Sequence, residues 1–135
     1  ALRNVLEVGT GCGYQTTVLA PLVSQVFSIE RVLPILERTK ERLTQFALNN
    51  VRLRHGDGFA GWKAYAPYEG IIVAAAPMAV PEALVHQLSP RGGRLVIPVG
   101  PEGAQELLRI TRKDDNVIRE RLGIVSFVPL LEGTA

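Results

Sequence analysis

The stretch that decides the fold of this chain is Val5-Leu6-Glu7-Val8-Gly9-Thr10-Gly11-Cys12-Gly13-Tyr14. Residues 5–8 read as a short buried strand, and a helix is predicted from Tyr14 to Val23. Between them lie three glycines in five residues, which let the backbone turn sharply and approach a ligand with no Cβ in the way. A strand, a glycine turn and a helix in this order predict an open α/β sheet with its ligand at the strand end.

The glycine spacing separates two classes of ligand. A dinucleotide fingerprint would place its third glycine at position 14, which is Tyr14 in this chain. Glu7 lies two residues before the first glycine, and a carboxylate is a poor neighbour for a pyrophosphate because like charges repel at short range. The same carboxylate suits a ligand that carries a cation, such as the amino group or sulfonium of S-adenosylmethionine. The alternative is a tight turn that binds no ligand.

Two further predicted strands, 26–29 and 51–55, end beside acidic residues. Glu30 lies 21 positions after Gly9, close to the ~20 expected for a carboxylate that accepts hydrogen bonds from ribose hydroxyls. Asp57 stands between two glycines, where it could reach an adenine amino group. A solvated glutamate and an ordinary Asp-Gly turn are the alternatives. Three such features at successive strand ends together favour a nucleoside-like ligand.

The remaining elements continue the alternation of strand and helix. A helix is predicted to begin at Pro34, with Leu36, Leu43 and Ala47 on its apolar face. Trp62 is interpreted as a cover for the sheet rather than a ligand platform. The later elements are a strand at 70–75, a helix at 81–88, a strand at 94–99, and strand-like segments at 107–112 and 117–130 joined by a hairpin turn at 113–116. Helix thus gives way to antiparallel strands at one edge of a mostly parallel, doubly wound α/β sheet.

The composition is that of a globular protein and excludes several classes. The length of 135 residues predicts a single domain, 1–135, and 47% of its residues are hydrophobic. A net charge of +2 is too small to argue for nucleic acid, and no apolar run approaches the ~20 residues of a membrane span. The single cysteine excludes an internal disulfide and fits a reducing, cytoplasmic location. With only two histidines, no metal site is expected.

Five blocks give the chain a resemblance to a known family. They are residues 7–16, 54–58, 71–77, 95–100 and 127–130, and in this order they resemble the protein-L-isoaspartate O-methyltransferase family. Cys12 departs from the family pattern, where serine is common. The chain also starts at the first strand, whereas the family carries a preceding segment that supplies much of the peptide-binding surface. The domain is therefore expected to be incomplete at its N-terminus and to show little or no turnover alone.

The resemblance implies a Rossmann-like class I methyltransferase sheet that binds S-adenosylmethionine. It implies methyl transfer to the free carboxylate of L-isoaspartyl residues in damaged proteins and peptides. The chain is expected to be a monomer. The resemblance assigns no catalytic residue. The residues that it places at the methyl donor are Glu7, Gly9, Thr10, Gly11, Gly13, Glu30, Arg31, Asp57 and Gly58. Those that it places beside the acceptor are Ala75, Ala76, Pro77, Val128, Pro129 and Leu130.

The chemistry available in the sequence agrees with this implication. A carboxylate with a pKa of ~4 is already ionised at neutral pH, so its methylation needs no general base. No Gly-x-Ser-x-Gly elbow is present, which argues against a hydrolase. The alternatives left open are a class I methyltransferase for another small acceptor, a non-catalytic S-adenosylmethionine-binding domain and, third, a nicotinamide-dependent oxidoreductase.

Overall fold

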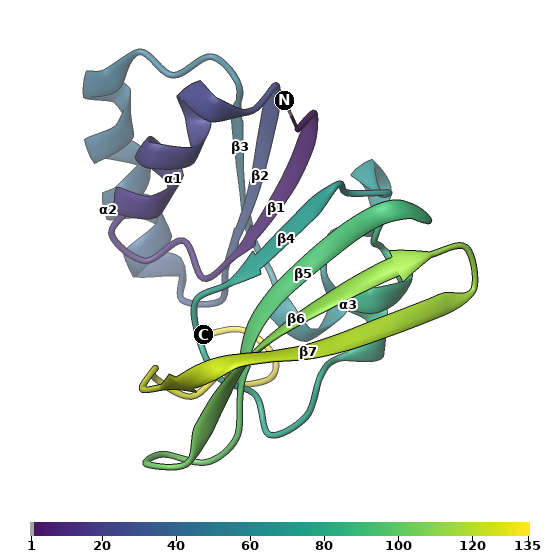
Figure 1. Ribbon diagram of the computed structural model, residues 1–135. Helices are drawn as coiled ribbons and strands as arrows, with labels where there is room; N and C mark the ends of the chain where they lie inside the picture. The colour runs from purple at the N-terminus through teal and green to yellow at the C-terminus, as the bar shows by residue number, and fades with distance from the viewer. Residues whose placement is uncertain (1) are drawn as a thin grey trace.

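A single seven-stranded sheet organises the computed structural model, which describes residues 2–135 (Figure 1). The strand order is β3-β2-β1-β4-β5-β6-β7. The first five strands of this order are parallel, while β6 and β7 are antiparallel to their neighbours. The strands are β1 (Asn4–Val8), β2 (Gln25–Glu30), β3 (Val51–His55), β4 (Gly70–Val73), β5 (Arg91–Val99), β6 (Gln105–Lys113) and β7 (Asn116–Val125). This arrangement confirms the predicted mostly parallel sheet with an antiparallel C-terminal edge.

The order of strands reverses at β1, which pairs with β2 on one side and with β4 on the other. Open α/β sheets bind their ligands at such a switch point, outside the carboxyl ends of the strands. The topology therefore places a candidate site where β1, β2 and β4 end.

Helices lie on both faces of the sheet (Figure 1). Helices α1 (Tyr14–Leu19) and α2 (Leu33–Leu43) cover one face beside β1 to β3, and α3 (Glu82–His86) lies on the other. Short 3₁₀ turns complete the connections at Ala20–Leu22, Thr44–Phe46, Gly58–Ala60 and Lys63–Tyr65.

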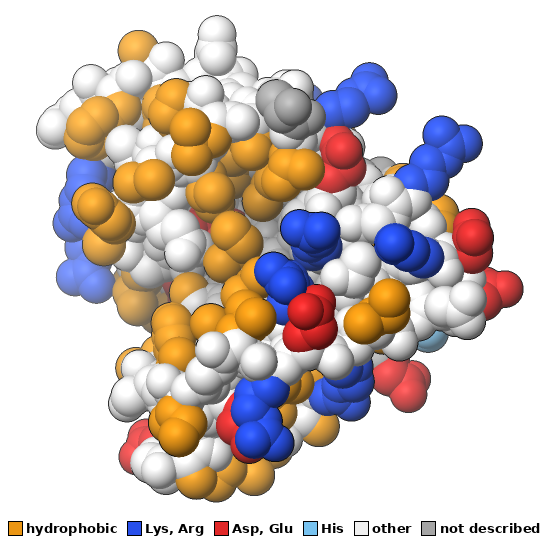
Figure 2. Space-filling view, viewed as in Figure 1, with side chains coloured by type: hydrophobic (Ala, Val, Ile, Leu, Met, Phe, Trp, Pro, Cys, Tyr) orange, Lys and Arg blue, Asp and Glu red, His pale blue; other side chains and the backbone are white. Residues whose placement is uncertain are grey.

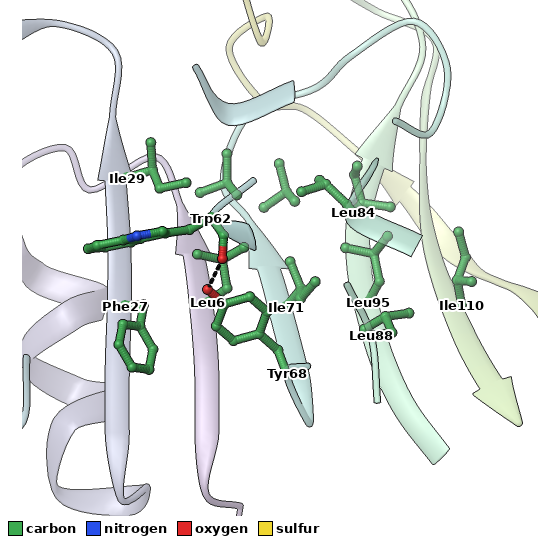
Figure 3. Packing of buried hydrophobic residues seen from close by; sticks show 13 residues of the cluster. Leu6, Phe27, Ile29, Trp62, Tyr68, Ile71, Leu84, Leu88, Leu95 and Ile110 are labelled. Carbon is green, nitrogen blue, oxygen red and sulfur yellow. Dashed lines mark hydrogen bonds between the residues drawn. The ribbon is translucent and has the colours of Figure 1, made fainter. Parts of the chain in front are cut away.

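The main hydrophobic core lies on the face that α3 covers (Figure 3). Side chains alternate along a strand, so Leu6 and Val8 of β1 enter this core while Val5 and Glu7 point to the opposite face. Trp62 belongs to the core, with its ring 5.6 Å from that of Phe27 at an angle of 81°. The core position of Trp62 agrees with the prediction that it covers the sheet.

The opposite face is partly bare. Beside α1, a groove of about 450 Å³ runs over β4 and β5, and Figure 2 shows hydrophobic side chains gathered over this part of the molecule. Its apolar walls come from Leu2, Val5, Leu19, Leu22, Val23, Ile71, Ile72 and Val96. A doubly wound sheet normally carries a covering layer at such a place.

Several predicted boundaries are wrong. The first helix ends at Leu19 and tightens into a 3₁₀ turn that contains Pro21, because proline cannot donate the hydrogen bond that the α-helix needs. Ala47 lies beyond α2 with φ of 50° and is exposed, so it does not belong to the apolar face of that helix. The fifth strand begins earlier than predicted, at Arg91. The last strand ends at Val125, and residues 126–131 leave the sheet edge.

The longest helix among residues 2–135 is α2, with 11 residues. No helix in that range is both long enough and apolar enough to cross a membrane. The same residues include no group of three or more His, Cys, Asp or Glu side chains placed to hold a metal ion.

Candidate functional site

The glycine turn between β1 and α1 is built on backbone conformations that favour glycine. Gly9, Gly11 and Gly13 have φ angles of 99°, 54° and 84°, in the left-handed region that side chains with a Cβ rarely adopt. The N–H groups of Gly9 and Thr10 both donate to the carbonyl oxygen of Ile29, at 2.9 and 3.2 Å. The turn is therefore fixed to the end of the neighbouring strand, β2.

Side chains of β2 and α2 hold the same turn from outside. Thr39 donates to the carbonyl oxygen of Gly11, and Arg42 donates to that of Cys12 at 2.9 Å. The hydroxyl groups of Thr10 and Ser28 form a hydrogen bond with their oxygens 2.6 Å apart. These contacts leave the turn little freedom, which is what a site for a defined ligand needs.

Glu7 lies beneath the turn and not in the open site. Its side chain is 0% exposed and accepts hydrogen bonds from Thr16, from Ser28 at 2.6 Å and from Gln15 at 2.9 Å. Burial raises the pKa of the Glu7 carboxyl, and the hydrogen bonds from Ser28, Thr16 and Gln15 only partly offset that rise. The carboxylate thus joins α1 to β2 under the turn. It is not exposed to a ligand cation, although the sequence analysis predicted a place beside one.

Glu30 and Asp57 lie at the ends of β2 and β3, as predicted. Glu30 is buried at the cavity wall and accepts from the N–H groups of Gly11 and Val32 at 2.9 and 3.1 Å. Asp57 accepts from the N–H of Phe59 at 2.9 Å and so caps the 3₁₀ turn at Gly58–Ala60. A carboxylate has about four acceptor positions, so both groups keep capacity for a ligand hydroxyl or amino group.

The segment after β7 crosses back over the end of β4. The N–H of Ala76 donates to the carbonyl oxygen of Val128 at 2.7 Å, and the N–H of Leu130 donates to that of Ala76 at 2.9 Å. This parallel bridge brings two segments together that are about fifty positions apart in the sequence.

A cavity of about 310 Å³ lies between these parts, in the range of about 300–1,000 Å³ typical of small-molecule sites. Its walls are mostly apolar, as such sites usually are. The predicted residues that line it are Gly9, Gly11, Glu30, Arg31, Gly58, Ala75, Val128, Pro129 and Leu130. The lining residues that the sequence analysis missed are Val8, Ile29, Val32, Ile35, Ala74 and Leu131.

Six predicted residues lie near this cavity without lining it. Glu7 and Thr10 are buried under the turn, and Gly13 begins α1. The others are Asp57, Ala76 and Pro77. Strand periodicity could have found part of the missed wall, because Val8 and Ile29 are strand-end residues on the same face as the core.

The cavity has features that fit a nucleoside carrying an amino-acid chain. The backbone of Gly11 faces open space, since no described heavy atom beyond its two chain neighbours lies within 4 Å of the place that a Cβ would take there. A Cβ at Gly58 would lie 2.5 Å from Cγ1 of Val8, so a side chain at this position would clash with the cavity wall. Among residues 2–135, the buried Nε of Arg31 has no hydrogen-bond partner and is a donor that a ligand could satisfy.

Comparison with known proteins places this geometry in a family. The sequence model of the family described as protein-L-isoaspartate(D-aspartate) O-methyltransferase (PCMT) matches residues 1–135. A protein-L-isoaspartate O-methyltransferase of Halorhodospira halophila is 59% identical over 131 residues, which are 97% of this chain and 59% of that protein. Another, of Ectopseudomonas mendocina, is 56% identical over 98% of this chain and 62% of its own length. The chain thus spans about three fifths of the curated relatives that it matches.

Solved structures give the same result. One protein-L-isoaspartate O-methyltransferase superposes with a TM-score of 0.86 at 28% identity, over 93% of this chain and 41% of that one. A Plasmodium falciparum protein described as a beta-aspartate methyltransferase (PCMT), in complex with S-adenosyl-L-homocysteine, has a TM-score of 0.80 at 26% identity, over 95% and 65%. With its fold, its glycine turn and its match along the whole sequence, the chain belongs to the protein-L-isoaspartate(D-aspartate) O-methyltransferase family.

Proposed function

We propose that this chain is the donor-binding domain of an enzyme that methylates the free carboxylate of L-isoaspartyl residues in damaged proteins and peptides. The observation that carries the proposal is the cavity at the ends of β1, β2 and β4, built from the glycine turn and Glu30. It lies in a chain that is 59% identical to a protein-L-isoaspartate O-methyltransferase. The methyl donor of the proposal is S-adenosylmethionine.

The residues divide along the cavity by their chemistry. The backbone at Gly9 and Gly11 would hold the amino-acid part of the donor, and Glu30 would accept from the ribose hydroxyls. Asp57, beside Gly58, would accept a hydrogen bond from the adenine amino group. Nε of Arg31 would donate a hydrogen bond to S-adenosylmethionine as well. Glu7 contributes by fixing the turn from below.

The acceptor side is formed by small and apolar residues. Ala75 and the segment Val128–Leu130 line the cavity together with Glu30. When bound, S-adenosylmethionine supplies a methyl group that its sulfonium already activates. The chain's part is to orient the two reactants and to exclude water, since alignment alone can supply a rate effect of many orders of magnitude. The acceptor carboxylate is ionised at neutral pH, so the proposal needs no catalytic base from this chain.

Binding and transfer experiments test the proposal in sequence. Titration calorimetry should show binding of S-adenosylhomocysteine and none of NAD. A version of the enzyme extended at its N-terminus, given methyl-labelled donor and an isoaspartyl peptide, should form a base-labile methyl ester. Binding of NAD instead would favour the oxidoreductase alternative. Label on nitrogen or on a nucleic acid would favour a methyltransferase for another acceptor.

We infer that the chain acts as a monomer in the cytoplasm. The exposed edge strand β7 carries Arg119, Glu120 and Arg121 at its centre. Charged side chains at an edge oppose strand-to-strand association. If two copies of β7 paired antiparallel about any one of these three residues, that residue would face its own copy, and like charges would lie opposite each other. Cys12 is a free, exposed thiol, which fits a reducing compartment. Sedimentation velocity at micromolar concentration tests the monomer.

A further inference from the structure

Gln105 begins β6 and is 1% exposed, although its side chain is polar. Both atoms of its amide bind the main chain of one residue beyond β7. Nε2 donates to the carbonyl oxygen of Phe127 at 2.9 Å, and Oε1 accepts from the N–H of Phe127 at 2.7 Å. The pair Gln105–Val125 is where pairing of β6 with β7 ends, so these bonds begin where the strand ladder stops.

A glutamine amide offers one acceptor and donors in the arrangement of a peptide group. The side chain of Gln105 therefore takes the place of a neighbouring strand for Phe127, beyond the point where the backbone of β6 pairs with β7. Without it, the N–H and carbonyl of Phe127 would depend on water. The chain between Val125 and the Ala76 bridge at Val128 would then lose its fixed direction.

The direction matters because the next residues form a wall of the cavity. Val128, Pro129, Leu130 and Leu131 line it. Val128 is 68% exposed and Leu131 is 53% exposed, while Leu130 is partly buried against the core, so this wall has few buried apolar contacts. Segments of that kind are held mainly by hydrogen bonds, and the described ones are the Gln105 pair at its start and the Ala76 bridge in its middle.

We propose that Gln105 is a positioning residue for ligand binding, which acts through Phe127 to hold the 128–131 wall over the donor cavity. Gln105 does not itself line that cavity. The proposal rests on the proposed function, because it takes S-adenosylhomocysteine as the ligand to be measured.

The chain uses the same device a second time. Gln87 is also buried; its Oε1 accepts from the N–H of Trp62 and its Nε2 donates to the carbonyl oxygen of Ala60, both at 2.9 Å. This second glutamine holds the loop that follows Asp57 and Gly58 at the cavity. Two separate segments at the cavity are thus each held by the side-chain amide of a buried glutamine. This repetition favours a positioning role for Gln105.

The test compares three variants of the full chain. Gln105→Met keeps the shape and removes both hydrogen bonds, and Gln105→Glu keeps the acceptor but loses the donor. Ile110→Val is the matched control, since Ile110 is a core residue of the same strand that does not touch residues 126–131 by hydrogen bond. The measurements are the Kd for S-adenosylhomocysteine and the amide exchange of the 126–132 segment, followed by mass spectrometry.

In Gln105→Met we expect the Kd to rise about tenfold and exchange to quicken in 126–132 alone, since two partly buried hydrogen bonds to one segment are lost. Ile110→Val should change neither quantity beyond its general effect on stability. Gln105→Glu should regain affinity as pH falls, because a protonated carboxylic acid again offers one donor and one acceptor.

Two results would overturn the proposal: an unchanged Kd in Gln105→Met with unchanged exchange, or equal losses in Ile110→Val. If the unsubstituted chain binds no S-adenosylhomocysteine, the proposed function fails by itself. The exchange of 126–132 in Gln105→Met then still decides whether Gln105 holds the wall, with quicker exchange supporting the clamp and unchanged exchange refuting it.

Discussion

The N–H of Gly11 donates a 2.9 Å hydrogen bond to Oε1 of Glu30, which ties the glycine turn after β1 to the end of β2. The other oxygen of Glu30 accepts from the N–H of Val32 at 3.1 Å. One carboxylate thus holds the backbone at two places in the wall of the cavity that it also lines. Substitutions at Glu30 therefore have to separate its bonds to the protein from its bonds to a ligand.

Replacing Glu30 should weaken binding of the methyl donor. Losing a charge-assisted pair of hydrogen bonds costs about 1.5–3 kcal/mol. Glu30→Ala should therefore raise the Kd for S-adenosylhomocysteine roughly tenfold to a hundredfold in titration calorimetry. Glu30→Gln, which can still accept from Gly11, should keep the fold and lose less affinity.

The matched control for this experiment is Glu37→Ala, which removes an exposed carboxylate from α2. It should leave the Kd unchanged. An unchanged Kd in Glu30→Ala would refute the assignment of Glu30 to the ribose.

The buried carboxyl of Glu7 should make stability depend on pH. Burial raises its pKa above the ordinary value of 4.5, so the folded chain binds more protons than the unfolded chain between that value and the raised one. Stability therefore falls as pH rises through this window. We expect the free energy of unfolding of the unsubstituted chain to decline relative to Glu7→Gln from about pH 4 upward, measured by urea denaturation.

The exposed carboxylate of Glu41 in α2 supplies the control, as Glu41→Gln. Its stability should follow that of the unsubstituted chain at every pH. If the free energy of unfolding of the unsubstituted chain instead rose relative to that of Glu7→Gln as pH increased, the hydrogen bonds to Glu7 would outweigh its desolvation.

The fold was largely predictable because its signals are local. Glycines with positive φ, the proline at the start of α2 and alternating apolar strands each act over a few residues. The end of α1 was missed although Pro21 is a local signal for it. Other predictions failed where distant contacts decide. Nothing near Ala47 shows that α2 has already ended, and nothing in residues 117–130 shows that the chain leaves the sheet at Val125 to bridge Ala76.

The residues of the site that follow strands could be predicted from the sequence, whereas the residues that hold them in place could not. Glu30 and Asp57 follow strands, which the sequence shows directly. Whether Glu7 faces a ligand or the protein depends on Thr16, Ser28 and Gln15, which the fold brings to it from two other elements. Gln105 gave no signal at all, since its partner Phe127 lies 22 positions away.

A methyl group added at Gly58 should disturb both the fold and the cavity. The new Cβ would lie 2.5 Å from Cγ1 of Val8 and 3.5 Å from Cδ1 of Leu130, and all three residues line the cavity. Overpacking of this kind costs about 1–3 kcal/mol. Gly58→Ala should lower the midpoint of thermal unfolding and weaken donor binding. Gly56→Ala, whose nearest contact would be an ordinary 3.5 Å, is the control and should do neither to the same extent.

The bare groove beside α1 should make the 135-residue chain marginally stable. Its wall of Leu19, Leu22, Ile72 and Val96 is apolar and uncovered within residues 2–135, and exposed patches of this kind normally have a covering partner. We propose that a version extended at the N-terminus covers it, unfolds at higher temperature and binds less of a hydrophobic dye. Equal stability and turnover of the two versions would place the domain boundary elsewhere.

The last prediction is that the extended enzyme distinguishes an L-isoaspartyl residue from the normal L-aspartyl residue. The iso linkage adds a methylene to the main chain and leaves the carboxylate on a shorter arm, so the two isomers present their oxygens at different positions. Displacements of ~1 Å at the reacting atoms can cost roughly a hundredfold in rate. The bridge to Ala76 uses the carbonyl of Val128 and the N–H of Leu130, and we expect the carbonyl of Pro129 between them to accept from the peptide main chain and set its register.

Matched peptides that differ only in this linkage, incubated with methyl-labelled donor, decide the prediction. Base-labile ester should accumulate on the isoaspartyl peptide and remain near background on the aspartyl one. A third peptide with the isoaspartyl carboxylate amidated is the control, because it keeps the linkage and removes the acceptor oxygen. Equal labelling of the two carboxylate peptides would mean that the cavity beside Val128–Leu130 does not fix the register, and a methyltransferase for a different acceptor would then be the better assignment.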